Sequence, residues 1–329
     1  MISRQYLARR LCYSAASFFV CVTITFFILH LMPGDYITNY LLSLSNTLPR
    51  EAVEQFYQQY GLNLPLTNQY ILYICNILQG QWGYSYQYGI PVFPLIVEKL
   101  SWSLLLLLPA TLIGILIGIV LGAWSGWRSG GKQDLALFNT MIVIRAIPEF
   151  WWGIMAVMVF GFYLHMFPLG GYSSISVLTT GLDPWDVLYH AILPISLMTF
   201  LIATGNYYMM RNSMIAVIGE DYITTARAKG LDERTVLWRH ALKNALLPMV
   251  TMTTFQVAGI LMGNVFIETV FSWPGIGLLT TEALRMRDLP LLEGILLLDT
   301  LITIGAMLAA DILASYIDPR IRMGTDDQA

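Results

Sequence analysis

Charged residues are scarce in this chain of 329 residues, and their scarcity excludes most soluble protein classes. Asp, Glu, Lys and Arg make up only 12% of the sequence, whereas soluble globular proteins carry about 25%. Hydrophobic residues make up 56%, and the mean hydropathy is +0.62. These fractions exclude a cytosolic enzyme, a nucleic-acid-binding protein and a disordered scaffold, and they indicate an integral membrane protein surrounded by a lipid bilayer.

Cysteine and metal-binding patterns are also lacking. The three cysteines, at positions 12, 21 and 75, lie in apolar stretches and are too few for a disulfide framework. The four histidines are scattered, and none pairs at metal-ligand spacing. No protease motif such as HExxH is present, so the sequence predicts no catalytic residues, no metal site and no cofactor bound by this chain.

One segment imitates a phosphate-binding loop. Residues 126–133 match the pattern GxxxxGK up to Lys132, but Gln133 stands where the loop needs a Ser or Thr hydroxyl for magnesium. The preceding sequence is apolar over the length of a membrane helix, whereas a phosphate-binding loop follows a strand. We therefore interpret the segment as a glycine-rich turn and expect no ATP binding by this chain.

Six apolar stretches are long enough to cross a bilayer as helices, which takes about 20 residues. Their approximate ranges are 11–32, 101–124, 146–166, 187–210, 246–267 and 291–315. The sequence therefore predicts an all-α membrane protein whose residues 1–329 form one domain with six transmembrane helices. Two long connections are expected, an external loop at 33–100 and a cytoplasmic loop at 211–245. Within the external loop, the short apolar run 71–78 is expected to lie along the membrane interface.

Lysine and arginine are unevenly divided between the two sides of these spans. Of the 18, fourteen lie before the first span, after the sixth, or in the connections after the second and fourth. Since cytoplasmic loops are enriched in positive residues, this distribution predicts that both termini are cytoplasmic. An even number of spans requires both termini on one side, so the two arguments agree.

Polar groups inside apolar spans are costly and are therefore candidates for function. Asp299 would lie about 12 Å inside the sixth span by helix rise, so it needs a partner or a wet cavity. Lining a transport path and pairing with another helix are equally open for it. Asn206, Gln256 and Asn264 could join helices or line a path, and joining is favoured. Glu268 is expected to fix the loop that follows the fifth span.

Glycines recur at four-residue spacing in two of the spans. They are Gly114, Gly118, Gly122 and Gly126 in the second span, and Gly259 and Gly263 in the fifth. Such spacing removes side chains from one helix face and lets another helix approach closely in lipid. Close packing is favoured at both places over a hinge.

The connection between the fourth and fifth spans is the most polar part of the chain. Glu220 and Asp221 would open a short helix there, and Arg227 and Lys229 would close it. Acidic residues at the start and basic residues at the end match the helix dipole. The charges therefore predict a short helix at the cytoplasmic face.

A second short helix is expected directly after the first. Gly230 suits the left-handed position that follows a helix, and Asp232 can cap a helix that runs to Pro248. The two helices would form a compact projecting knob. On the residues alone, an ordinary polar connector explains this segment equally well.

Several segments carry a resemblance that covers about residues 4–322. In chain order they are Met32-Pro-Gly-Asp35, Tyr60-Gly-Leu62, Ile147-Pro-Glu-Phe-Trp151, Ala226-Arg-Ala-Lys-Gly-Leu231, His240-Ala-Leu-Lys-Asn-Ala-Leu-Leu-Pro248, Glu268-Thr-Val-Phe-Ser-Trp-Pro-Gly-Ile-Gly277 and Asp318-Pro-Arg-Ile-Arg322. The cytoplasmic loop resembles the EAA-loop signature of permease subunits of binding-protein-dependent ABC importers. The chain as a whole resembles the B-type subunit of the dipeptide and oligopeptide permease family.

The chain departs from that family pattern in three places. Thr224-Thr225 replaces the Glu-Ala of the EAA signature, Gly80-Gln-Trp-Gly83 replaces Gly-Asp-x-Gly, and the loop at about 167–186 is shorter than in many peptide permeases. The last two departures concern the substrate rather than the family.

The resemblance implies a type I ABC importer permease fold in a bacterial or archaeal plasma membrane. It implies that residues 219–230 form a coupling helix seated in a cytoplasmic ATPase subunit. The residues expected at that contact are Glu220, Asp221, Tyr222, Thr225, Ala226, Arg227, Lys229 and Gly230. The residues expected to face the translocation path are Asn206, Gln256, Asn264 and Asp299.

The resemblance also implies partners. They are a second, C-type permease subunit, two cytoplasmic ABC ATPase subunits that bind ATP and magnesium, and an extracytoplasmic substrate-binding protein. Di- and oligopeptides are the expected cargo, and oligosaccharides or a nickel or other metal complex are the alternative for the same machinery. A stand-alone secondary transporter is a different class, but it would usually show inverted repeats and matching broken spans that this sequence lacks. A membrane enzyme would need a set of catalytic residues, and the sequence predicts none.

Overall fold

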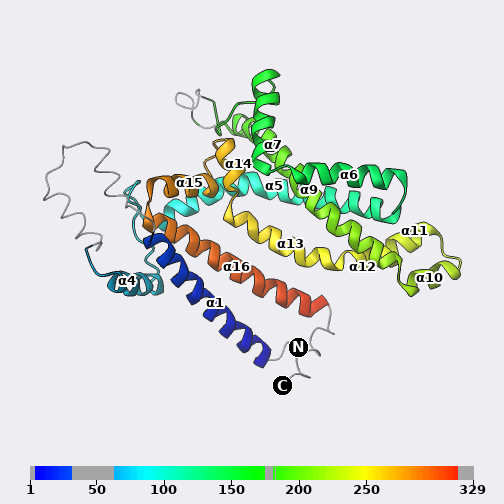
Figure 1. Cartoon of the computed structure of the whole chain (residues 1–329), viewed down its shortest axis with the longest axis horizontal. Helices are drawn as coiled ribbons and strands as arrows, with labels where there is room; N and C mark the ends of the chain where they lie inside the picture. Colours follow the sequence, from blue (N-terminus) through cyan, green and yellow to red (C-terminus); the bar gives the residue numbers. More distant parts are fainter. Residues whose placement is uncertain (1–3, 32–62, 175–180, 182, 318–329) are drawn as a thin grey trace.

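The computed structural model describes residues 4–31, 63–174, 181 and 183–317. Within these residues the regular structure is helical, and one isolated β-bridge joins Tyr84 to Pro91. In the described part, five helices are long and apolar enough to cross a membrane, or six if one bent pair counts as a single span. The all-α class predicted from the sequence is confirmed (Figure 1). The family segments at 32–35, 60–62 and 318–322, and the loop residues 33–62, lie outside the described residues.

The first and last helices of the chain form an antiparallel pair. Helix α1 spans Arg4–His30 and α16 spans Leu289–Ile317, and the two run side by side in Figure 1. The end of α1 meets the start of α16, where His30 Nδ1 lies 3.6 Å from a carboxylate oxygen of Glu293. The described ends of the chain therefore lie at the same end of this pair. Both helices match the expected first and sixth spans closely.

Two long helices form the centre of the molecule. Helix α5 spans Val92–Trp127 and α9 spans Pro184–Ile218, and they share the largest helix–helix contact in the described residues. Helix α5 begins nine residues before the expected boundary at residue 101. The expected external loop 33–100 is therefore too long, because Glu98 and Lys99 are polar residues within the helix rather than loop residues.

The expected third span, 146–166, is broken in the structure. Helix α6 spans Lys132–Ala146, and α7 (Glu149–Ala156) continues as a π-helix, η1, over Val157–Tyr163. The two parts meet at an angle of 92°. Ile147 is extended, as the residue before a proline prefers, and Pro148 starts the second part. The bend lies at the first residues of the expected span, and the residues that follow it, Glu149–Tyr163, are helical as predicted.

The expected fifth span also contains a break. Helix α13 (Leu247–Gly259) passes into one 3₁₀ turn, η3 (Ile260–Met262), and then into α14 (Val265–Val270). Gly263 between them has a φ of +74°, a left-handed conformation that favours glycine. A short helix, α15 (Ile276–Met286), follows and leads to α16.

This break corrects the expectation that Gly259 and Gly263 form a second packing ridge. A Cβ at Gly259 would have no heavy atom within 4 Å. At Gly263 a Cβ would lie 2.8 Å from the backbone nitrogen of Gly277, so the close approach there is to the following loop. The alternative, a hinge at these glycines, stays a prediction.

A short apolar helix packs against the α1–α16 pair. Helix α4 spans Leu66–Leu78, which at 13 residues is too short to cross a bilayer. The hydroxyl groups of Thr23 and Tyr70 are 2.7 Å apart, and the rings of Phe26 and Tyr73 stack, so α4 contacts the C-terminal half of α1. The short run at 71–78 is thus part of a helix that does not span, as expected.

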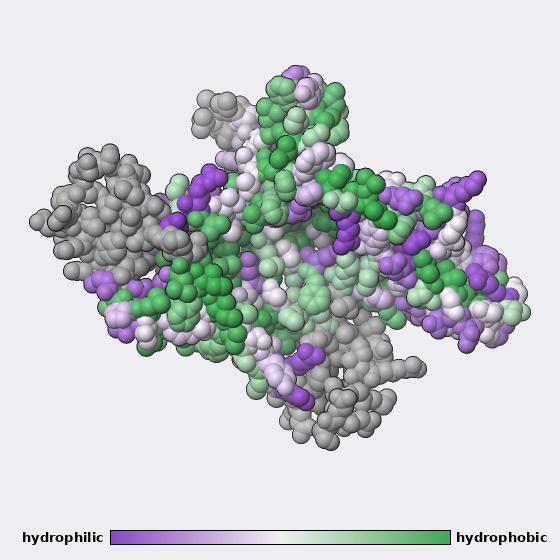
Figure 2. Space-filling model, in the orientation of Figure 1, coloured by the Kyte–Doolittle hydropathy of each residue, from purple (hydrophilic) through white to green (hydrophobic). Residues whose placement is uncertain are grey.

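Apolar residues cover much of the outer surface. Large apolar side chains on α1, α5 and α7 are exposed, as contact with lipid requires. Figure 2 shows this apolar surface in the middle of the molecule and a hydrophilic surface at the end that carries the 219–245 segment.

Candidate functional site

The first helix of the polar knob forms where the sequence predicts it. Helix α10 spans Asp221–Ala228, with Glu220 extended before it and Lys229 directly after it. Asp221 lies in the first turn and Arg227 in the last, so both ends of the helix carry the charge that stabilises it.

Gly230 forms the joint between the two helices of the knob. Its φ of +76° is left-handed, which confirms the expected position. Asp232 then caps α11 (Glu233–Thr235), accepting a hydrogen bond from the backbone nitrogen of Thr235 at 3.2 Å. The side chain and backbone amide of Thr235 hold the pKa of Asp232 below its usual range. The helix continues through η2 (Val236–Ala241) and α12 (Leu242–Ala245) into α13.

Two apolar residues anchor α10 to the rest of the chain. Ile223 is fully buried and Ala226 is 5% exposed. They pack in a cluster with Met210 and Met214 of α9, Val236, Ala241 and Ala245 of the second short helix, and Met249 of α13. Ala226 was expected at a contact with a partner, but its side chain faces the chain's own interior. Displacing α10 must therefore displace the ends of α9 and α13.

Arg227 ties the knob together. Its guanidinium donates to both carboxylate oxygens of Glu233, at 3.0 and 3.3 Å, and lies 5.3 Å from the ring centre of Trp127 at the end of α5. An exposed ion pair of this kind contributes about 0–1 kcal/mol, and the ring contact adds to it. Its side chain is still 40% exposed, so the expected contact of Arg227 with an ATPase subunit stays a prediction.

Tyr222 connects α10 to α12. Its hydroxyl accepts a hydrogen bond from Asn244 Nδ2 at 2.9 Å, and Asn244 belongs to the segment 240–248 that resembles the family pattern. Thr225 donates its hydroxyl proton to the carbonyl of Asp221 at 2.9 Å. Within residues 220–230 the exposed residues are Glu220, Asp221, Tyr222, Thr224, Thr225, Arg227, Ala228, Lys229 and Gly230.

The glycine ridge of the second span packs as predicted. A Cβ at Gly118 would lie 2.5 Å from the Cβ of Asn206, and one at Gly122 would lie 2.6 Å from the carbonyl oxygen of Tyr207. Gly114 and Gly126 meet α9 in the same way. The ridge therefore lets the backbones of α5 and α9 touch.

Asn206 and Gln256 join two helices. Asn206 is fully buried on α9, and its Nδ2 donates to the carbonyl of Ile202 at 3.0 Å and to Gln256 Oε1 of α13 at 3.2 Å. This is the helix-joining role favoured from the sequence. Gln256 also lines a cleft of about 380 Å³. The other residues of the cleft are Ile144, Arg145, Ile147, Pro148, Glu149, Leu201, Ile202, Thr204 and Gly205.

Asn264 caps a helix, and its expected place on the translocation path stays a prediction. Its side-chain oxygen accepts a hydrogen bond from the backbone nitrogen of Ile267 at 2.8 Å, which starts α14. Its own backbone nitrogen donates to Glu268 at 3.0 Å. These bonds give Asn264 a local structural role.

Glu268 fixes the following loop, as the sequence predicts. The carboxylate is fully buried and accepts four hydrogen bonds. The donors are Ser103 Oγ at 2.8 Å and the backbone nitrogens of Asn264, Gly277 and Leu278 at 3.0, 2.7 and 3.3 Å. Helix α5, the start of α14 and the start of α15 are thus held by one side chain.

Asp299 stays without an assigned contact. Its Oδ1 is buried and has no hydrogen-bond partner among the described residues. It lies on α16, outside the residues that line the 380 Å³ cleft. Both roles expected from the sequence, a wet path and a structural pair, remain predictions.

Two buried carboxylates were not singled out in the sequence. Asp134 of α6 pairs with Arg211 of α9, and Asp288 accepts hydrogen bonds from Ser85 Oγ and from the backbone nitrogen of Gln87. Each carboxylate ties a turn to a distant helix. Asp134 was not singled out from the sequence, because the charge distribution in this part of the chain was counted from lysine and arginine only.

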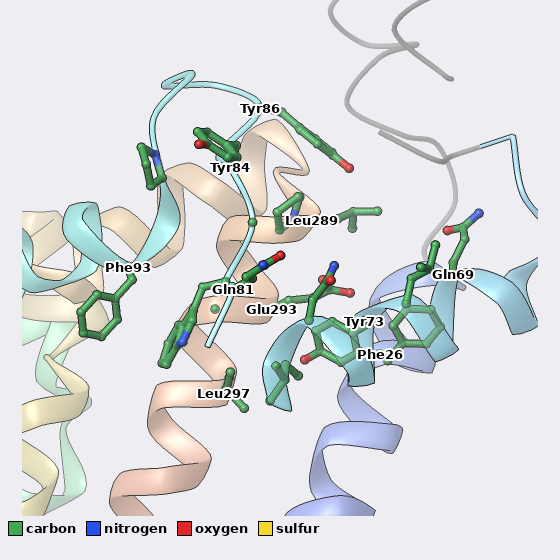
Figure 3. Close-up of a pocket in the computed structure, with 18 of the residues that line it drawn as sticks. Phe26, Gln69, Tyr73, Gln81, Tyr84, Tyr86, Phe93, Leu289, Glu293 and Leu297 are labelled. Carbon is green, nitrogen blue, oxygen red and sulfur yellow. The ribbon is translucent and has the colours of Figure 1, made fainter. Parts of the chain in front are cut away.

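A second cavity, of about 1250 Å³, lies at the meeting point of α1, α4 and α16 (Figure 3). The segment 79–94 closes one side of it. Glu293 and Tyr73 line it, and Figure 3 shows these side chains with Gln81 between the helices. Sequence reasoning missed this site, because Glu293 lies close to the start of the sixth span, where a carboxylate can reach the membrane interface. Its side chain is instead only 13% exposed.

No metal-binding cluster is formed by the described residues: they contain no group of three or more His, Cys, Asp or Glu side chains close enough to share an ion.

Comparison with known families covers most of the chain. Residues 114–323 match the family described as "Binding-protein-dependent transport system inner membrane component". Residues 3–106 match the family of the corresponding N-terminal part of such membrane components. The first match includes the knob, the cleft and both helices of the glycine contact.

Similar proteins match over nearly their whole length. The chain is 35% identical to the oligopeptide transport system permease protein AppB of Bacillus subtilis, over 96% of this chain and 98% of that protein. It is 32% identical to the dipeptide transport system permease protein DppB of Escherichia coli K12, over 97% of this chain and 98% of that protein. The DppB protein of Lactococcus lactis is also 32% identical, over 97% of this chain and 99% of that protein.

Proposed function

The chain belongs to the family of binding-protein-dependent transport system inner membrane components, and from this we propose that it forms half of the translocation pathway of an ATP-driven importer of di- and oligopeptides. It is a multi-pass membrane transport subunit rather than an enzyme. The observation that carries the finer proposal is the rigid knob at 219–245 in a chain that is similar over nearly its full length to peptide permeases.

The proposed coupling element is the segment 219–230, which contains α10. Its exposed residues include Glu220, Asp221, Lys229 and Gly230, which leaves polar groups available to a cytoplasmic ATPase subunit. Ile223 holds the opposite face of α10 in the chain's own core. A helix that is exposed on one face and anchored on the other can transmit a push without unfolding.

Motion of α10 would reach the membrane through α9 and α13. The cluster around Met210 and Met249 connects α10 to both helices. Helix α9 is in turn packed against α5 along the glycine ridge. ATP-driven closure of two ATPase subunits would therefore move a connected set of helices between inward- and outward-open states.

The proposed path for the cargo runs past Gln256 and the 380 Å³ cleft. Gln256 supplies a polar group there, and Arg145 and Glu149 supply one charge of each sign. A short peptide carries a positive amino end and a negative carboxyl end, so opposite charges suit it. Asn206 would act indirectly by holding Gln256, and Asp299 is retained as a path candidate.

The proposed importer contains further subunits besides this chain. They are a second permease subunit, two ABC ATPase subunits that bind ATP and magnesium, and an extracytoplasmic substrate-binding protein. Peptides are favoured over oligosaccharides or a metal complex, because the similar proteins are named for dipeptide and oligopeptide transport. With both termini cytoplasmic, as proposed from the charge distribution, the knob faces the ATPases.

The assembly is tested by a mild-detergent pull-down of the tagged chain from its native membrane, followed by mass spectrometry. We expect a second membrane permease and ATPases with phosphate-binding loops. A variant with Ile223→Asp, which puts a charge where a buried side chain anchors α10, should recover the second permease but lose the ATPases. Recovery of the chain alone in several detergents would contradict the proposal and favour a stand-alone transporter.

The cargo is tested separately by uptake of labelled di- and tripeptides into cells with and without the chain. We expect peptide uptake to require it. Uptake of peptides that is unchanged in its absence, together with lost uptake of an oligosaccharide or of nickel, would contradict the peptide assignment and leave the importer assignment standing.

A further inference from the structure

The 1250 Å³ cavity at α1, α4 and α16 lies away from the knob and the 380 Å³ cleft. It is formed at the end of α1, near His30, and at the start of α16, near Leu289. The ends of spanning helices lie where lipid headgroups meet water. The cavity is therefore within reach of both headgroups and dissolved molecules.

A carboxylate in this cavity has no donor. Glu293 Oε1 is buried and has no hydrogen-bond partner among the described residues. The imidazole nitrogen His30 Nδ1 is 3.6 Å away and lies 3.0 Å from the carbonyl oxygen of Phe26. Because a carbonyl only accepts, the proton of His30 Nδ1 belongs to that bond. Glu293 Oε1 thus presents an acceptor that the described residues do not satisfy.

A second polar group faces the carboxylate from α4. The hydroxyl of Tyr73 is buried and also has no hydrogen-bond partner among the described residues. Burial and the neighbouring charge of Glu293 raise the pKa of Tyr73, so its phenol stays neutral. A ligand that donates several hydrogen bonds can reach both oxygens, since a phenol oxygen also accepts.

Aromatic rings also line this cavity. Phe26, Tyr73, Trp82, Tyr84 and Phe93 line the cavity, and the rings of Trp82 and Phe93 lie 5.2 Å apart. Ring faces attract cations, and an unpaired carboxylate does so more strongly. The lining therefore favours a positively charged group that carries N–H donors.

We propose that this cavity binds a primary ammonium group between Glu293 and Tyr73. The group can come from the headgroup of phosphatidylethanolamine or from the amino end of a short peptide, which present the same chemistry. Glu293 accepts an N–H bond and balances the charge, Tyr73 accepts a second, and the aromatic rings cover the rest. The site is distinct from the proposed cargo path and does not depend on it.

Native mass spectrometry of the full chain in detergent tests the proposal. The probes are phosphatidylethanolamine, phosphatidylcholine, which has no N–H donors, phosphatidylglycerol, which has no ammonium, and the dipeptide alanyl-alanine with its N-acetylated form. We expect phosphatidylethanolamine, or alanyl-alanine relative to its acetylated form, to bind at least about tenfold more tightly than its matched control. The lipid arm and the peptide arm identify the source.

Variants assign the binding to the cavity. Glu293→Gln should remove the preference for the ammonium probe, whereas Glu98→Gln, at a carboxylate that is 61% exposed, should leave it unchanged. Gln81→Trp should block binding by filling the cavity while keeping Glu293, and its intact fold is checked by thermal unfolding. Equal binding of all probes by the unaltered chain, or a preference that survives in Glu293→Gln or Gln81→Trp, would overturn the proposal.

Discussion

Arg211 of α9 and Asp134 of α6 form a bidentate ion pair in which both nitrogen–oxygen distances are 2.7 Å. Asp134 is fully buried, and it also accepts hydrogen bonds from Ser125 Oγ and from the backbone nitrogen of Gly130. One carboxylate thereby fixes α6 and the glycine-rich turn before it against the two central helices. The turn that imitates a phosphate-binding loop is held by a protein carboxylate.

Removing Arg211 should therefore destabilise the chain strongly. Arg211→Met leaves the Asp134 charge buried without a counter-charge, which costs about 3–5 kcal/mol. The double variant Arg211→Met with Asp134→Leu removes both charges and should recover part of that loss. Unfolding in detergent, followed by tryptophan fluorescence, measures both. A double variant less stable than Arg211→Met would contradict this account.

The four hydrogen bonds of Glu268 give a second stability prediction. Glu268→Ala leaves Ser103 and three backbone nitrogens without their acceptor, so we expect a loss of about 3 kcal/mol or more. Ser103→Ala removes one donor and should cost about 1 kcal/mol. In a double-mutant cycle the two losses should not add, because the same bond is broken in both. Strict additivity would show that the bond between them contributes nothing.

Replacing glycine by alanine should have opposite effects on stability at Gly118 and at Gly259. Gly118→Ala places a methyl group 2.5 Å from Asn206, so α5 and α9 must separate, and we expect a loss of about 1–3 kcal/mol. Gly259→Ala meets no atom within 4 Å and lies in α13. It should be neutral or stabilise by about 0.5–1 kcal/mol, because alanine favours helix. The two variants are compared by thermal unfolding. Equal effects would mean that α5–α9 contact is not tight.

Gly230 should be essential for transport but not for insertion. Gly230→Pro cannot adopt a φ of +76°, so the joint between α10 and α11 must change direction. We expect peptide uptake to fall to background while the amount of chain in the membrane is unchanged. Gly219→Ala is the matched control, because Gly219 ends α9 with a φ of −76°. Normal uptake by Gly230→Pro would show that α10 does not couple the chain to ATP hydrolysis.

Substitution of Asp299 separates the two roles expected for it. Asp299→Leu should lower uptake without lowering stability if the carboxylate lines the path. A loss of stability would instead indicate a structural pairing. Uptake and thermal unfolding are measured on the same preparations, with Thr300→Val as the neighbouring control, since Thr300 bonds only to the carbonyl of Leu296 in the described contacts. Normal uptake and stability would exclude both roles.

Local chemistry was predictable wherever one residue type settles the conformation. Gly230 at a left-handed joint, Asp232 at a helix start and Glu268 beside a loop all follow from the backbone groups they satisfy. The positions of five spans also follow, because an uncharged apolar run of about 20 residues fits a membrane helix better than any structure in water.

Helix breaks and buried ion pairs were not predictable in the same way. Pro148 marks a helix start, but the 92° angle depends on what packs around it. Gly263 and Gly259 look alike in the sequence, and only contacts with the 276–277 segment distinguish them. Asp134 and Arg211 are 77 residues apart, so no spacing rule could pair them.

In the 219–230 segment, the exposed residues were predictable from the sequence and the buried ones were not. Glu220, Asp221 and Lys229 are exposed as a contact surface requires. Ala226 belongs to the same short motif, yet it packs inward, because a helix of eight residues must place some side chains against its support. A family motif contains exposed and buried residues alike, and the motif itself does not show which residues are which.

The glycine ridge also fixes the alignment of the two central helices along their axes. From Gly114 to Gly126 the backbones stay in contact over about 18 Å, and each missing side chain faces a particular turn of α9. A shift by one residue would bring side chains into those gaps, so sliding is blocked. We therefore expect α5 and α9 to move as one unit, which can tilt but in which the two helices cannot slide along each other. The two helix interruptions, at Ile147 and Gly263, lie outside this pair, in the segments that follow α5 and α9 in the chain.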